Sequence, residues 1–162
     1  MITLKPVLIN KNNFKKFGTL ISVSNKKGKV INNGYATKFS NLVNLNAFKN
    51  KGSPAISIFK AKKRKFPLTI DHLEMHPLSS QAFIPLKNKK FICCVCPISK
   101  KPNLKKIKAF IIPEDQGIVY NKKVWHFPLI ATDNMNFLVI ERIGKYKNLE
   151  RFYFNENIKL KL

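Results

Sequence analysis

"LTIDHLEMHPLSSQAFIPL", residues 68–86, contains two of the three histidines of the chain and two of its eight acidic residues. A proline and a Ser-Ser-Gln segment separate two apolar, β-rich runs, a pattern that predicts two strands joined by a turn. Alternate residues of a strand share one face, so His72, Glu74 and His76 are expected to point the same way. Such spacing is typical either of a solvated sheet edge or of the wall of a pocket.

Short strands of the same kind continue in both directions from this stretch. Residues 68–75 and 81–86 are two of them, and the others are TLISVS (19–24), KVINNG (29–34), AISIFKA (55–61), KFICCVC (90–96), IKAFII (107–112), GIVY (117–120), VWHFPLIA (124–131) and NFLVIER (136–142). Clusters of turn-forming residues divide these runs. About ten strands at this spacing predict an all-β barrel or sandwich, because closure removes exposed edges.

One short helix is expected before the first of these strands. Asn12 or Asn13 can cap this helix, and Gly18 can end it. Phe14 and Phe17 give it an apolar side. We see no internal repeat and no linker, so residues 1–162 are expected to form a single domain.

The charge of the chain is strongly positive, with a net value of +23. Only three of its 31 basic residues are arginines, namely Arg64, Arg142 and Arg151. Lysine is a point charge, whereas the planar fork of arginine makes the bidentate contacts that read guanine and phosphate. We therefore expect no specific nucleic-acid partner, and salt-sensitive binding to polyanions is the weaker alternative function.

Composition and cysteine usage favour a cytoplasmic globular protein. The apolar fraction of 44% is ordinary for a globular chain. No apolar run approaches the roughly 18 residues of a membrane helix, and no secretory signal is visible at the start. Cys93, Cys94 and Cys96 lie together in one strand without the paired spacing of a zinc site, so they are expected to be reduced, buried apolar residues.

A small barrel with a chemical function often gathers polar side chains at one mouth. Cupins use His-x-His, then Glu, then Gly, with a further His in a later strand pair. This chain resembles a degenerate version, with Glu74-x-His76 in the first slot and Gln81 in the Glu slot. Asn88 stands in the Gly slot and His126 in the late His slot.

Longer phrases resemble one family more specifically. INNG (31–34), PLTIDHLEMHPLSSQAFIPL (67–86), QGIVY (116–120), VWHFPL (124–129) and FLVIER (137–142) closely resemble the ureidoglycolate lyase family, over roughly residues 2–142. The resemblance implies a cupin-like (RmlC-like jelly-roll) barrel, a homodimer and the conversion of ureidoglycolate to glyoxylate and urea in allantoin breakdown. The lysine-rich tail, residues 143–162, lies outside it and is either a last strand, a partner-binding arm or a frayed end.

The resemblance also implies roles for individual residues. His76 and His126 are the candidates for proton transfer, because an unperturbed imidazole pKa of about 6.5 lies near working pH. Gln81 is expected to hold the ureido group or to orient His76. The implied cofactor is a divalent, nickel-type metal, for which the candidate ligands are Glu74, His76, Gln81 and His126. Glu74 is equally well explained as a surface partner of lysines, and His72 is expected outside the pocket.

Further residues are candidates for substrate binding. Lys38 and Lys60 stand where the family has arginines, and Arg142 matches a family arginine that would hold a carboxylate. Trp125 is expected to wall the pocket. Asn33 either contacts substrate or shapes an Asn-Gly turn.

Some positions depart from the family pattern. Asn121 and Phe127 replace histidines of the family, and Met75 replaces an arginine. Three functions therefore stay open: a ureidoglycolate lyase, a metal-dependent lyase or isomerase for another small carboxylate, and a barrel that only binds such a molecule.

Overall fold

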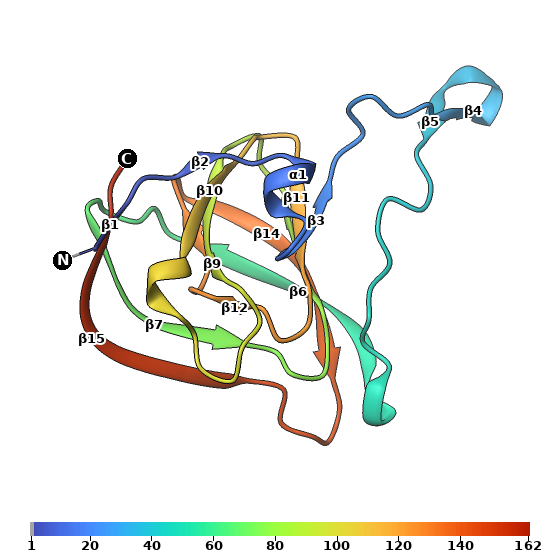
Figure 1. Ribbon diagram of the computed structural model, residues 1–162. Helices are drawn as coiled ribbons and strands as arrows, with labels where there is room; N and C mark the ends of the chain where they lie inside the picture. The colour runs from blue at the N-terminus through green and yellow to red at the C-terminus, as the bar shows by residue number, and fades with distance from the viewer. Residues whose placement is uncertain (1) are drawn as a thin grey trace.

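Two β-sheets face each other in the computed structural model, which describes residues 2–162 (Figure 1). The larger sheet has the order β1 (Ile2–Leu4), β15 (Glu150–Leu160), β7 (Leu68–Met75), β12 (Trp125–His126), β9 (Phe91–Cys96), β10 (Lys108–Ile112) and β2 (Val7–Leu8), with β13 (Ile130–Ala131) also paired to β9. The smaller sheet has the order β3 (Gly18–Ile21), β11 (Gly117–Tyr120), β8 (Gln81–Pro85), β14 (Met135–Ile143) and β6 (Ser53–Ala61). The curled larger sheet forms a half-barrel, which confirms the expected all-β, cupin-like fold class.

Strand β9 is buried on both faces, because the larger sheet separates two apolar cores. Its odd-numbered residues join the core between the sheets, whereas Ile92, Cys94 and Cys96 join a second core on the other face. All three cysteines are buried and free, as expected. Burial raises the pKa of the Cys94 thiol to about 12, so this thiol stays protonated and is a poor metal ligand.

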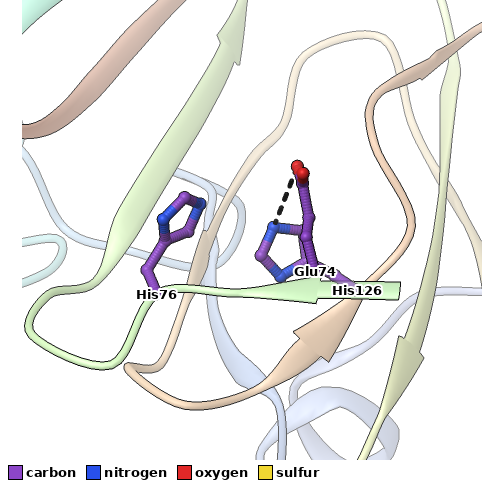
Figure 2. A group of neighbouring side chains, drawn as sticks. All are labelled: Glu74, His76 and His126. Carbon is purple, nitrogen blue, oxygen red and sulfur yellow. Dashed lines mark ion pairs between the residues drawn. The ribbon is translucent and has the colours of Figure 1, made fainter. Parts of the chain in front are cut away.

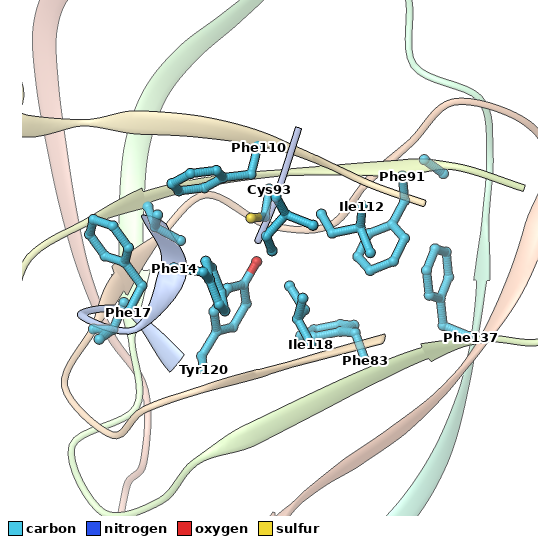
Figure 3. Packing of buried hydrophobic residues seen from close by; sticks show 14 of the residues in the cluster. Phe14, Phe17, Phe83, Phe91, Cys93, Phe110, Ile112, Ile118, Tyr120 and Phe137 are labelled. Atoms are coloured by element: carbon cyan, nitrogen blue, oxygen red, sulfur yellow. The ribbon is translucent and has the colours of Figure 1, made fainter. Parts of the chain in front are cut away.

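Aromatic side chains fill the core between the sheets (Figure 3). The rings of Phe14 and Phe110 meet edge to face with centroids 5.6 Å apart. Phe91 and Phe137, from opposite sheets, make a similar contact at 5.1 Å. Such pairs add to the hydrophobic stabilisation that comes from burying the rings. The first contact holds the N-terminal helix against the larger sheet, and the second holds the two sheets together.

The expected helix is present but shorter than predicted. Helix α1 spans Lys11–Phe14, and its cap is Asn10, whose side chain accepts hydrogen bonds from the N–H groups of Asn12 and Asn13. The prediction of a cap at Asn12 or Asn13 is therefore wrong by two or three positions, because Asn13 instead closes a reciprocal capping box. Gly18 already belongs to β3, where a Cβ atom would lie 1.9 Å from the Val119 carbonyl oxygen.

A long excursion between β3 and β6 leaves the two sheets. It carries the hairpin of β4 (Lys29–Ile31) and β5 (Ala36–Lys38), which stands away from the body in Figure 1. The connecting 3₁₀ turn, η1 (Asn32–Gly34), has positive φ at all three residues, as an Asn-Gly turn favours. The excursion returns through the short turn η2 (Lys49–Lys51).

The C-terminal tail is a strand. β15 pairs antiparallel with β7 and parallel with β1, and its Ile158 and Leu160 are fully buried in the second core. The expected strand 124–131 is instead split into β12 and β13, with the turn around Pro128 between them, because proline cannot donate to a strand ladder. The remaining 3₁₀ turn is η3 (Leu104–Lys106). Within residues 2–162, no helix has both the length and the apolar character needed to cross a membrane.

Candidate functional site

Three polar side chains converge where β7 and β12 lie side by side (Figure 2). His126 pairs with Glu74 across the two strands, and His76 follows the end of β7. The imidazole centroids of His76 and His126 are 5.3 Å apart, and Nε2 of His126 lies 3.9 Å from Oε1 of Glu74. One ligand atom from each of the three residues lies within 4.8 Å of the others. The structure thus brings together three of the residues singled out in the sequence.

Both histidines are held in the same tautomer by main-chain carbonyl groups. Nδ1 of His76 lies 2.6 Å from the carbonyl oxygen of Asn148, and Nδ1 of His126 lies 3.0 Å from that of Val124. A carbonyl oxygen only accepts hydrogen bonds, so each Nδ1 carries the proton. Each Nε2 then has a free lone pair, and among residues 2–162 neither Nε2 has a hydrogen-bond partner although both are buried.

Burial keeps His126 neutral. Desolvation is the main cause that lowers the pKa of His126 to about 3, and the charge repulsion that a second protonated ring would meet from nearby His76 lowers it further. The ring of Tyr120 stacks on that of His126 with centroids 4.4 Å apart. The hydroxyl of Tyr120 points toward the Cys93 thiol (Figure 3), and burial raises the pKa of this hydroxyl well above its usual value. The site therefore presents the neutral imidazole of His126 in an apolar surrounding.

The carboxylate of Glu74 lies between a histidine and an arginine. One oxygen approaches His126, and the other lies 3.3 Å from Nε of Arg151, which comes from β15. Its side chain is mostly buried, so the carboxylate belongs to the site. Its basic partner is an arginine of the adjacent strand and not one of the many lysines.

The donor set fits a divalent metal ion. Two imidazole nitrogens and a carboxylate are ligands that zinc, copper, iron and nickel accept. The fit rests on the two buried Nε2 atoms without partners, because a buried polar atom is rarely left unsatisfied. Gln81, the fourth ligand suggested by the sequence, lies at the start of β8 opposite Tyr120, and it lines the cavity beside His76.

A cavity of about 460 Å³ opens next to His76. Its walls include Gln81, Glu141 and Arg142 from the smaller sheet, and Tyr146 and Asn148 from the segment before β15. A volume of this order accommodates a small molecule. His126 lies behind His76 and does not line this cavity, so the cavity reaches one of the two imidazoles directly.

Arg142 has a structural role at the edge of the cavity. Its guanidinium donates to the carbonyl oxygens of Lys49 at 3.0 Å, Asn50 at 3.1 Å and Tyr146 at 3.4 Å. A Cβ atom at Gly52 would lie only 2.1 Å from its Nε, so this glycine leaves room for the side chain. The guanidinium of Arg142 thus joins the end of the β3–β6 excursion to the C-terminal segment. The neighbouring carboxylate of Glu141 does not pair with it and accepts a hydrogen bond from the Ser57 hydroxyl at 2.6 Å.

Three of the predicted substrate-binding residues lie away from this cavity. Asn33 and Lys38 belong to the hairpin that stands away from both sheets, where Asn33 shapes the turn (Figure 1). Lys60 is exposed on β6 and borders a separate depression with Lys87 and Asn134. These three predictions are therefore not met within one chain, because the positions lie on other faces of the molecule.

Trp125 and His72 also lie outside the cavity. Trp125 is buried in the second core, and its Nε1 donates to the carbonyl oxygen of Ser99 at 3.0 Å. Neighbouring strand residues point to opposite faces, so a strand that aims His126 at the site aims Trp125 away from it. His72 bonds to Asp71 at 2.7 Å and stacks on Tyr153, as expected for a residue outside the pocket.

Sequence reasoning missed Tyr120 and Asn148. Tyr120 ends the phrase QGIVY, and its position in a short apolar strand gave a usable signal for a buried partner of the site. Asn148 stands in a lysine-rich stretch without a motif. Only the pairing of β15 with β7 brings it next to His76.

Comparison with known proteins shows the family of the chain. The family model for ureidoglycolate lyase matches residues 1–161. A ureidoglycolate lyase of Pseudomonas syringae pv. tomato is 36% identical over 162 residues, which cover 99% of this chain and 94% of the relative. Relatives of the same name in Pseudomonas fluorescens and Pseudomonas aeruginosa are also 36% identical, with coverage of 98% and 100% of this chain and 95% and 96% of their own. The chain therefore belongs to the ureidoglycolate lyase family.

Proposed function

We propose that this protein is a ureidoglycolate lyase, which eliminates urea from ureidoglycolate and leaves glyoxylate. The observation that carries the proposal is the pair of adjacent imidazoles whose buried Nε2 atoms lack partners, one of which lines a cavity of small-molecule size. Full-length similarity to relatives named ureidoglycolate lyase supports the choice of substrate.

The reaction requires one proton to move from oxygen to nitrogen. The hydroxyl of the substrate loses its proton as the carbonyl group forms, the carbon–nitrogen bond breaks, and the departing ureido nitrogen takes up a proton. The ring of His76 lines the cavity and its Nε2 is buried without a hydrogen-bond partner, so this imidazole is the group we assign to the transfer. The same imidazole can accept the proton and return it to the nitrogen, so the step is balanced without another acid.

The remaining groups bind the substrate or support the imidazole of His76. Gln81 offers an amide to the ureido group from the cavity wall, and Arg142 offers positive charge to the carboxylate at the cavity edge. Buried His126, stacked on Tyr120, supports the neighbouring imidazole without direct contact with the cavity. A neutral ring at this place avoids repulsion when His76 takes up its proton.

Glu74, His76 and His126 would also hold a divalent ion, of the nickel type by family resemblance. Such an ion would polarise the oxygen atoms of a bound hydroxy acid. A lone pair cannot bind an ion and a proton at the same time. Metal analysis of the purified protein, together with activity after chelation, therefore distinguishes a ligand role of His76 from proton transfer.

The function is tested by supplying ureidoglycolate and measuring glyoxylate and urea. We expect His76→Gln to lower kcat by about 10²- to 10⁴-fold, the range for loss of a general acid or base. His72→Gln is the matched control, because His72 lies on the strand that leads to His76 but outside the cavity, and it should retain activity. The proposal would be overturned if folded wild-type protein, with and without added nickel, released no glyoxylate. Activity only toward other hydroxy acids would instead favour a diverged lyase.

We further propose a cytoplasmic homodimer that acts in the salvage of nitrogen from allantoin. Three free cysteines are typical of a reducing compartment. The outer face of the smaller sheet exposes Ile56 and Ile58 on β6, at 70% and 53%. Leu138 and Ile140 of β14 pair with these residues and extend the apolar face, which a second copy would cover.

A further inference from the structure

Asn148 lies between the cavity and the turn that follows β7. Its carbonyl oxygen contacts Nδ1 of His76, as described above. Its side-chain amide bridges two more residues of the turn: Oδ1 accepts from the N–H of Leu78 at 2.8 Å, and Nδ2 donates to Oγ of Ser79 at 2.8 Å. One residue of the C-terminal segment thus contacts three of the four residues 76–79.

We propose that Asn148 is a positioning residue that fixes the tautomer and the ring orientation of His76. The contact between Nδ1 and the carbonyl oxygen is only 2.6 Å long. The other tautomer would set the lone pair of Nδ1 against that of the oxygen, which is repulsive at this distance. Asn148 thereby keeps the unprotonated Nε2 directed at the space that it shares with His126 and Glu74.

The rest of the structure holds His76 and Asn148 in place from both sides. The N–H of Lys123, just before β12, donates to the carbonyl oxygen of His76 at 2.9 Å. β15 begins two residues after Asn148, where Glu150 pairs with Met75 of β7. The backbone on either side is thus anchored, and the amide of Asn148 is the link that sets the turn and its own carbonyl group relative to each other.

The direct test is the ¹⁵N spectrum of labelled histidines in chelator-treated protein near neutral pH. In the wild type, we expect His76 to show a protonated Nδ1 and an unprotonated Nε2. In Asn148→Ala, both amide bonds are lost, and His76 should become a mixture of tautomers. His126 should keep its single tautomer, because the Val124 carbonyl holds it independently. Asn155→Ala, an exposed asparagine of β15, is the matched control and should change neither ring.

Activity provides a second readout, which rests on the proposed function. Loss of a residue that orients a metal ligand or catalytic group typically costs about 10- to 100-fold, and we expect a fall of this size in kcat with a smaller change in KM. Asn148→Asp keeps an acceptor for Leu78 N–H and should restore part of the loss. If Asn148→Ala does not fold, Ser79→Ala removes one of the two amide bonds and should shift the His76 tautomer in the same direction.

An unchanged His76 spectrum in folded Asn148→Ala, or in Ser79→Ala if the first variant is unfolded, would overturn the positioning role. The two proposals fail in different ways. A protein without lyase activity would still show the tautomer change, whereas an active enzyme with an unaffected His76 tautomer would leave the lyase proposal intact.

Discussion

At the scale of single residues, the chemistry of the site depends on His126, a histidine that is buried without charge. His126 cannot easily take up a proton, because the surrounding apolar groups and the neighbouring imidazole disfavour the charged ring. A histidine in water has no such restriction. Folding therefore lowers the proton affinity of His126, and the stability of the protein is linked to pH through this residue.

We expect the metal-free protein to lose stability as the pH falls below about 6.5, the unperturbed pKa of histidine. Below that value the unfolded chain binds a proton at His126, whereas the folded state does so only near pH 3, where its own pKa lies. The free energy of unfolding should therefore fall by up to about 1.4 kcal/mol per pH unit from this group. Urea titrations between roughly pH 7 and 5 measure this change in the free energy of unfolding. The range lies above the ordinary pKa values of carboxyl groups, so their titration contributes little.

His126→Gln removes this titration and should flatten the pH dependence in that range. His72→Gln, outside the site, should leave the slope close to that of the wild type. An equal slope in wild type and His126→Gln would show that another group causes the acid sensitivity.

At the scale of elements, strand β15 connects the fold to the site. Its second half pairs with the first half of β7 and buries Ile158 and Leu160. Its first half pairs with the end of β7 and places Arg151 beside Glu74. The register shifts between these two halves, so each half keeps the pairing that its own residues require.

Ile158→Ala should reduce the free energy of unfolding by about 2–5 kcal/mol, the usual cost of deleting a large aliphatic side chain from a packed core. Ile158 is fully buried, whereas Ile98 is more than half exposed. Ile98→Ala should therefore change stability by less than about 0.5 kcal/mol. Chemical denaturation compares the two, and a similarly small effect of both substitutions would mean that β15 contributes little to the fold.

At the scale of the whole molecule, the net charge of +23 opposes self-association unless a surface poor in lysine is available. The outer face of β6 and β14 has this character around Ile56 and Ile58, with Lys60 at its end. β6 is also an edge strand of its sheet, and exposed edges of this kind favour pairing with another chain.

We expect the wild type to have twice the chain mass of 18.7 kDa in size-exclusion chromatography with light scattering. The double substitution Ile56→Lys and Ile58→Lys places two charges on the apolar face and should give a monomer. Ile98→Lys adds charge at an exposed site on another part of the surface and should remain dimeric. A wild-type monomer, or a dimer that tolerates both lysines, would exclude this face as the dimer contact.

The all-β class, most of the strands along the chain and the buried cysteine strand β9 followed from the sequence by itself, and the family phrases in it singled out His76 and His126. Side-chain alternation along a strand is a local property with a period of two residues. The same rule also implies that Trp125 faces away if His126 faces the site, although similarity to family phrases favoured both. A resemblance to a family identifies which residue types stand at matching positions, but it does not say on which face of a strand each side chain lies.

Only the tertiary structure decided which residues complete the site. Asn148 and Arg151 reach His76 and Glu74 because β15 pairs with β7 across more than seventy positions of sequence. Lys38 and Asn33 lie away from the site, because the two strands of their hairpin pair with each other and not with either sheet. Such pairings depend on long-range register and on which surfaces can be buried together, and no short stretch of sequence contains that information.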